Sequence, residues 1–229
     1  MAIPVYLALT AAEFRRCTAL PPHCAWLSCL FSPYGRGLSN VPKQLPPNAL
    51  LILSDRTPVC GHDGELIKAQ LEEAISALNC CGLLLDFQRP GCPEAQKIAA
   101  CLTKLPCPVA VSASYAKELD CPVFLPPVPL DVPLKEYVQP WAGRDIWLEA
   151  ATQNASIMLT AQGASYKEDY EEAPLSHIDA ALHCHYHVQP GQEEAIFYLR
   201  RTREDLDALL AEAETFGITR AVGLFQELG

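Results

Sequence analysis

The chain has 229 residues, 50% of them hydrophobic, and a formal net charge of −10 at pH 7. This length and composition can bury one sizeable core, so we expect a single domain. The acidic balance disfavours nucleic acid and anionic membranes as partners, since both reward a basic surface, and no apolar run approaches the roughly 20 residues that span a bilayer.

Short β-rich runs alternate with amphipathic segments along the chain, which favours a parallel sheet with helices outside it. Strands are expected at 4–9, 25–31, 49–54, 82–87, 109–112, 123–125, 145–150, 157–160 and 221–225. These nine strands slightly exceed the number in an eight-stranded barrel. Helices are expected at 63–79, from Pro93 onward and at 202–216, because these segments carry capping signals or a periodic apolar face.

Two β-rich runs on either side of a polar loop predict a hairpin at about 183–199, appended to the alternating pattern. The first run contains His183, His185 and His187. In an extended strand these three side chains share one face and could bind a metal ion. Histidines that face water on a hairpin strand are the more ordinary interpretation of the same pattern.

Polar residues interrupt an apolar run at the end of the expected strand 82–87. Asp86 and Gln88 lie two residues apart and project from one face, while Leu85 and Phe87 project from the other. An amide can hydrogen-bond a ligand, but it cannot transfer a proton as an acid at neutral pH. The pattern indicates a binding site without an acid at Gln88. A pair of rim residues that cap the following loop is the structural alternative.

This strand resembles the fourth-strand motif of family 18 glycoside hydrolases, which include chitinases and spore-cortex glucosaminidases and carry the pattern DGxDxDxE. Gly82 and Asp86 match the motif. Cys81 and Leu84 stand where the family has aspartates, and Gln88 stands where it has the catalytic glutamate.

The C-terminal part of the chain resembles the closing hairpin, last helix and eighth strand of the spore-cortex branch. That branch ends in W-x-L-G with a tryptophan on the floor of the sugar site, and Gln226 takes its place here. Residues 145–153 resemble the sixth strand, which ends in Tyr-Asp in the family. Thr152 and Gln153 would occupy those two positions, and residues 157–166 resemble the seventh strand.

The resemblance implies an α/β fold, a compact (β/α)8 TIM-type barrel over residues 1–229 with the extra hairpin before the last helix. Family members protonate the leaving oxygen with the glutamate while an aspartate orients the substrate's own acetamide. Losing the acid removes a step worth roughly 10²- to 10⁴-fold in rate. We therefore predict a catalytically inactive or impaired relative that binds a carbohydrate or another small polar ligand. The expected ligand-binding residues are Asp86, Gln88, Asp55, Glu149, Thr152, Gln153 and Gln226.

Two other functions stay open. One is an active hydrolase that uses Asp55, Asp86 or Glu149, or a metal ion held by the histidines. The other is a structural or interaction protein whose barrel pocket is filled by side chains. No phosphate loop or dinucleotide fingerprint occurs, so no cofactor is predicted, and the sequence identifies no protein partner.

Eleven cysteines occur without a CxxC pair, and most lie in apolar segments, which predicts buried free thiols in a reducing compartment. Residues 1–5 lack the basic region of a secretory signal. Both observations lead us to expect a cytoplasmic protein.

Overall fold

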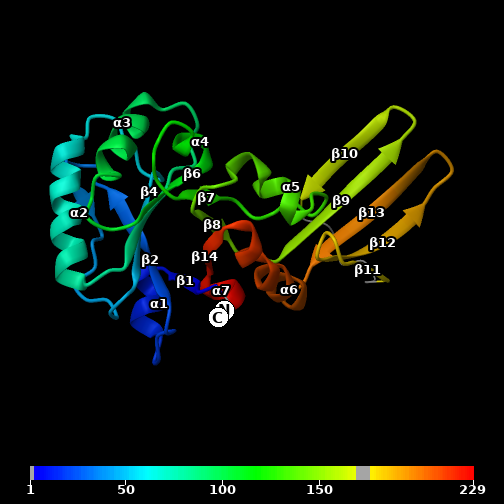
Figure 1. The fold of residues 1–229 in the computed structure, drawn as a ribbon, viewed down its shortest axis with the longest axis horizontal. Helices are drawn as coiled ribbons and strands as arrows, with labels where there is room; N and C mark the ends of the chain where they lie inside the picture. The colour runs from blue at the N-terminus through cyan, green and yellow to red at the C-terminus, as the bar shows by residue number, and fades with distance from the viewer. Residues whose placement is uncertain (1–2, 169–175) are drawn as a thin grey trace.

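A computed structural model describes residues 3–168 and 176–229 and contains a closed barrel (Figure 1). Each of the eight parallel strands in the described ranges pairs with the next along the chain, and the last pairs with the first. They are β1 (Val5–Leu9), β2 (Cys24–Phe31), β4 (Leu50–Ser54), β5 (Gly82–Asp86), β6 (Val109–Ser112), β7 (Val123–Leu125), β8 (Ile146–Glu149) and β14 (Ile218–Leu224). The short strand β3 (Leu38–Ser39) adds to β2 in antiparallel fashion. The predicted TIM-type barrel is confirmed.

Three long helices cover part of the barrel: α2 (Gly64–Leu78), α3 (Pro93–Leu102) and α6 (Arg203–Ala213). The other helices are shorter: α1 (Ala11–Arg16), α4 (Ala113–Ala116), α5 (Leu134–Val138), α7 (Phe225–Leu228) and the 3-10 turns η1 (Gln139–Trp141) and η2 (Glu214–Phe216). Their local signals are those expected, because Asp63 caps α2 and Thr202 forms a capping box with Asp205 on α6. None of the helices in the described ranges is long and apolar enough to cross a membrane.

The core has two parts, separated by the barrel wall. Leu83 and Leu85 of β5 point outward, into the layer that contains Ile67 of α2 and Ile98 of α3. Leu84 points inward, where the barrel is filled by Tyr6, Ala8, Ala25, Leu50, Ile52, Ala110, Phe124, Trp147 and Val222. All five residues of β5 are buried, so the alternation along this strand places its next inward positions at the carboxyl end of the barrel.

A second sheet is inserted between β8 and β14 and projects from one side of the barrel (Figure 1). Its strand order is β10-β9-β13-β12-β11, and all of its pairings are antiparallel. The strands are β9 (Gln153–Thr160), β10 (Gly163–Glu168), β11 (His177–Asp179), β12 (Cys184–Pro190) and β13 (Glu194–Arg201). The segment expected as a hairpin at 183–199 therefore lies in a five-stranded sheet.

This sheet corrects two sequence expectations. Residues 157–160 belong to β9 of the inserted sheet and not to the barrel. The longer segment 157–166, which resembles the seventh strand, spans parts of β9 and β10 of the same sheet. Residues 145–153 supply the seventh barrel strand, β8, and not the sixth, which is β7. A run of four or five apolar residues looks the same in a short parallel strand and in a half-buried antiparallel one, so periodicity could not separate them.

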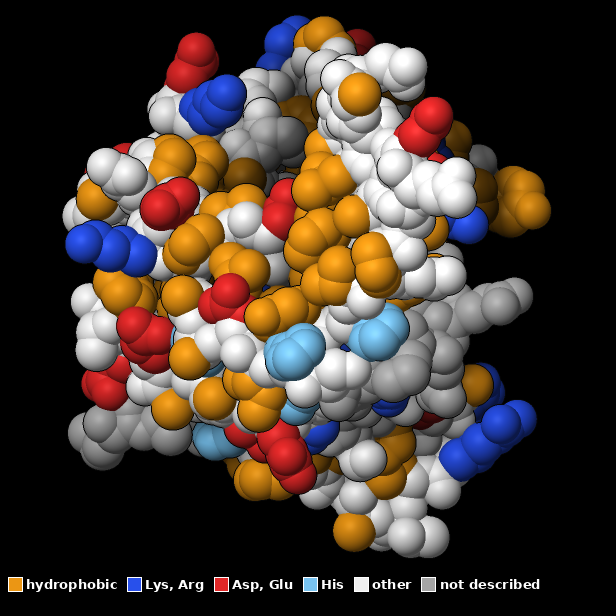
Figure 2. Space-filling view, turned by 90° about the vertical axis from the view of Figure 1, so that its right-hand side faces the viewer, with side chains coloured by type: hydrophobic (Ala, Val, Ile, Leu, Met, Phe, Trp, Pro, Cys, Tyr) orange, Lys and Arg blue, Asp and Glu red, His pale blue; other side chains and the backbone are white. Residues whose placement is uncertain are grey.

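One face of the inserted sheet is apolar. On that side Ile157 pairs with Phe197 across neighbouring strands, and Leu199 pairs with Tyr186. Leu130, from the loop after β7, packs on the part of this face nearest the barrel. Farther out, apolar side chains line a hollow of about 430 Å³ with Asp131 and Asp179 among them. Figure 2 shows hydrophobic side chains gathered beside acidic ones on this side of the molecule.

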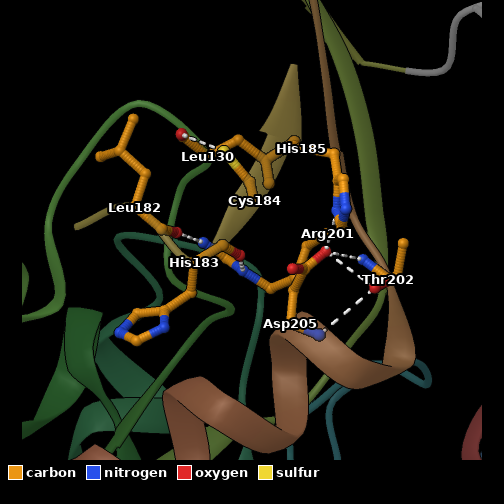
Figure 3. Close-up of polar contacts among 8 residues, drawn as sticks. All are labelled: Leu130, Leu182, His183, Cys184, His185, Arg201, Thr202 and Asp205. Atoms are coloured by element: carbon orange, nitrogen blue, oxygen red, sulfur yellow. Dashed lines mark hydrogen bonds and ion pairs between the residues drawn. The ribbon is translucent and has the colours of Figure 1, made fainter. Parts of the chain in front are cut away.

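Arg201, the last residue of β13, joins the inserted sheet to the barrel (Figure 3). Its side chain is only 1% exposed. The guanidinium donates to the carbonyl oxygens of Leu182 (2.9 Å), His183 (3.1 Å) and Val128, and to the side-chain oxygen of Gln153 (2.6 Å). A single buried cation therefore satisfies acceptors from β9 and from two loops, which links the sheet to the loop after β7.

Candidate functional site

Asp86 and Gln88 lie side by side at the carboxyl end of β5. The Gln88 amide nitrogen donates to Asp86 Oδ1 over 3.1 Å, and Asp86 is 9% exposed while Gln88 faces solvent. Phe87 points the other way, into an aromatic contact with Phe31 and Tyr115. The expected alternation places the acid and the amide together over the barrel interior, where ligands of such barrels bind.

Asp55 follows β4 and is engaged with the backbone of the neighbouring loop. Its two carboxylate oxygens accept from the backbone N–H groups of Gln88 (3.0 Å) and Arg89 (2.9 Å). The side chain is 2% exposed, so little of it is left for a ligand. Asp55 therefore positions the loop that carries Gln88.

Glu149 ends β8 and faces the same hollow as Asp86. Burial first, and then the negative charges of Asp86 and Glu227, together raise the pKa of Glu149 to about 7. Burial also raises the pKa of Asp86, against the opposing hydrogen bond from Gln88, with a further increase from Asp55. The site thus holds a carboxyl group that keeps a proton close to neutral pH.

Two adjoining hollows share Asp86, Gln88, Phe124 and Glu149. The one inside the barrel mouth has a volume of about 110 Å³. The other, of about 430 Å³, extends over the ends of β6 and β7 past Ser112 and Pro126. Space for a small polar ligand therefore exists beside the pair.

The remaining expected ligand residues lie elsewhere. Thr152 donates its hydroxyl to Glu227 Oε1 (2.5 Å), and Gln153 accepts from Arg201. Both also line a third hollow, of about 710 Å³, between the loop after β7 and the inserted sheet. Gln226 is exposed on α7 with its side chain beside Glu13, away from the hollow at Asp86.

His183, His185 and His187 contact three different partners in the structure. His183 precedes β12 with a left-handed backbone (φ 48°), which breaks the extended repeat that the expected shared face requires. His183 Nε2 lies 2.8 Å from Glu212, and His185 Nδ1 lies 2.8 Å from Asp205. His187 Nδ1 is instead 2.8 Å from the Ser176 hydroxyl. Each ring has its own partner, so the structure does not bring the three candidate histidines together.

Sequence reasoning missed two groups beside Glu149. Tyr137 of α5 has its pKa raised to about 12 by burial and by the charge of Glu149, and its hydroxyl donates to the Pro126 carbonyl (2.9 Å). Glu227 of α7 links the end of β8 to the C-terminus through Thr152. Neither residue belongs to a motif, and only the closure of the barrel by β14 brings Glu227 to β8.

A scan against family models and a search of curated proteins find no match to this chain. Among solved structures, the chain is similar to the spore cortex-lytic enzyme SleL of Bacillus cereus, with a TM-score of 0.54 and 8% identity over 99% of this chain and 71% of that one. For the chitinase-like agglutinin RobpsCRA of Robinia pseudoacacia, the TM-score is 0.57 and the identity 12%, over 97% and 94% of the chains. The chain has the chitinase-like barrel fold. Within this chitinase-like barrel, β5 is the fourth strand, which is where the motif resemblance places Asp86 and Gln88.

The similarity also covers SleL of Bacillus megaterium QM B1551, with a TM-score of 0.53 and 9% identity over 96% of this chain and 70% of that one. At these identities the likeness is one of fold. The sixth strand of this chitinase-like barrel ends at Leu125 and continues into Pro126 and Pro127. No Tyr-Asp pair follows it, so the Tyr-Asp motif of the family is absent from the end of the sixth strand.

Proposed function

We propose that this chain binds a carbohydrate at the mouth of the barrel without hydrolysing it by the substrate-assisted route. The observation that carries the proposal is the amide of Gln88, hydrogen-bonded to Asp86 beside an open hollow. The pair offers an amide and a carboxylate to the hydroxyl and acetamide groups of a sugar. The amide, however, cannot protonate the leaving oxygen. The similarity to a chitinase-like agglutinin supports binding as a function of such a fold.

Turnover of fluorogenic chito-oligosaccharides is expected to be absent or at least roughly 10²-fold below that of an active chitinase assayed beside it, because the acid step is missing. We expect Gln88→Glu to restore little activity. Leu84 fills the barrel interior where the family motif has an aspartate, and Gln226 points away from the hollow. Rates comparable to the reference enzyme, in either protein, would contradict the proposal.

Binding is tested separately by calorimetry with N-acetylglucosamine oligomers of increasing length. Asp86→Ala removes the carboxylate and should weaken binding by roughly tenfold or more, since a charged hydrogen bond contributes about 1.5–3 kcal/mol. Glu72→Gln, an exposed change on α2, serves as the control and should bind like the wild type. Equal affinity in the Asp86→Ala variant would place the ligand elsewhere.

A second candidate function is an active hydrolase with Glu149 as its acid. It is favoured by the pKa of Glu149, which burial raises to about 7, close to the value suited to general acid catalysis at neutral pH. In that case Glu149→Gln would remove any turnover, while Glu72→Gln would retain it. Turnover that survives Glu149→Gln would exclude this role.

A further inference from the structure

Two thiols and a carboxylate meet outside the candidate site, on the segments that follow the neighbouring barrel strands β4 and β5. Cys60 lies between β4 and α2. Cys92 is the N-cap residue of α3, and Glu94 lies in the first turn of that helix. The sulfur atoms and one carboxylate oxygen all lie within 4.8 Å of one another. They are the one such group of three among residues 3–168 and 176–229.

The spacing fits a tetrahedral zinc ion. Zinc binds sulfur at about 2.3 Å and carboxylate oxygen at about 2.0–2.2 Å, which places two tetrahedral ligands about 3.6 Å apart. Cys92 Sγ and Glu94 Oε2 are 3.7 Å apart. Thiolate and carboxylate are both established zinc ligands, and soft sulfur disfavours magnesium and calcium.

The backbone around these donors is already held in place. Asp55 bonds the loop after β5, and the Arg89 guanidinium donates to the Arg56 carbonyl (2.8 Å), so the two loops are cross-linked. The Cys92 N–H donates to the Tyr115 hydroxyl (3.3 Å). The Cys92 side chain makes no capping bond to its helix, which leaves its sulfur able to bind an ion.

We propose that Cys60, Cys92 and Glu94 bind one zinc-class divalent cation, with water as the fourth ligand. Cys60 and Glu94 are exposed and Cys92 is partly exposed, so an ion can enter from solvent. Binding releases the two thiol protons to solvent. The ion clamps the loops that carry Asp55 and Gln88, and the site does not depend on the proposed carbohydrate function.

The chain provides a matched comparison in Cys101 and Glu65. The Cys101 sulfur lies 3.3 Å from Glu65 Oε1, at a partly exposed position between α3 and α2. This pair has the same chemistry as Cys92 and Glu94 but lacks the second sulfur. It should therefore not hold zinc with comparable affinity.

The experiment uses full-length protein, freed of metal with a chelator under reducing conditions, incubated with zinc and passed through a desalting column. We expect one zinc per chain by mass spectrometry, and a thiolate-to-metal absorption band when cobalt replaces zinc. The double variant Cys60→Ser/Cys92→Ser should lose both signals. Glu94→Gln should weaken zinc binding at least roughly tenfold, because even the loss of a residue that only orients a metal ligand costs about that much. Cys101→Ser should bind like the wild type.

Three results would each overturn the proposal. They are wild-type protein that retains no stoichiometric zinc, a double variant that retains it, and a Cys101→Ser variant that loses it. Circular dichroism of every variant establishes that it is folded. A partial loss in Cys60→Ser or Cys92→Ser alone supports the site, because each single variant keeps two of the three donors.

Discussion

Replacing Arg201 by methionine is expected to lower the free energy of unfolding by about 3–5 kcal/mol, the range for breaking a buried charged contact. Methionine fills much of the same space but donates no hydrogen bonds. The carbonyl oxygens of Val128, Leu182 and His183 and the side chain of Gln153 would then lose their donor in a region that excludes water. An unpaired buried acceptor costs about 1–3 kcal/mol, so even two of them account for the loss.

Denaturant unfolding followed by circular dichroism measures this effect, and the apparent melting temperature should fall by roughly 6–20 °C. Arg15→Met is the matched control, because Arg15 is exposed and its side chain bonds only the Ala11 carbonyl (3.0 Å) among the contacts described. That change should stay within about 0.5 kcal/mol of the wild type. Similar losses in both variants would show that burial of Arg201 contributes nothing.

Glu149→Gln is expected to stabilise the protein at pH 8, by about 1–3 kcal/mol, and to change little near pH 4. Burial, with the charges of Asp86 and Glu227, raises the pKa of Glu149 from 4.5 to about 7 in the folded state. Between these two values the folded state holds a proton that the unfolded state has lost. Stability therefore falls as the pH rises through this window, and the cost is complete above it. Each pKa unit corresponds to about 1.4 kcal/mol, reduced here because Glu149 is only partly buried.

The measurement is the free energy of unfolding between pH 4 and pH 8 for wild type and variant. The difference between the two should grow with pH and level off above neutrality. Glu72→Gln, which removes an exposed carboxylate from α2, should give a nearly flat difference. A Glu149→Gln effect that is the same at pH 4 and pH 8 would mean that Glu149 is not protonated in the folded protein near neutrality.

Several features could be predicted because their physical cause is local. The alternation of Leu84, Asp86 and Gln88 against Leu85 and Phe87 follows from strand geometry alone. The ends of α2 and α6 follow from capping side chains within the same segments. Burial of the cysteines was predicted less well, since Cys24, Cys29 and Cys184 are the buried ones among the eleven. An apolar segment does not determine which of its residues reaches the surface.

The sequence by itself located the eight barrel strands among nine candidates, the long helices, and an acid beside an amide at the end of the fourth strand. These depend on periodicity and on residues a few positions apart. Only the tertiary structure decided that Asp55 bonds the backbone of the next loop and that Glu149 lies near the carboxylates of Asp86 on β5 and Glu227 on α7. It also brought Cys60 to Cys92 and enclosed Arg201 between the sheet and the barrel. Such contacts arise when the barrel closes, because burial and charge depend on neighbours that lie far away along the chain.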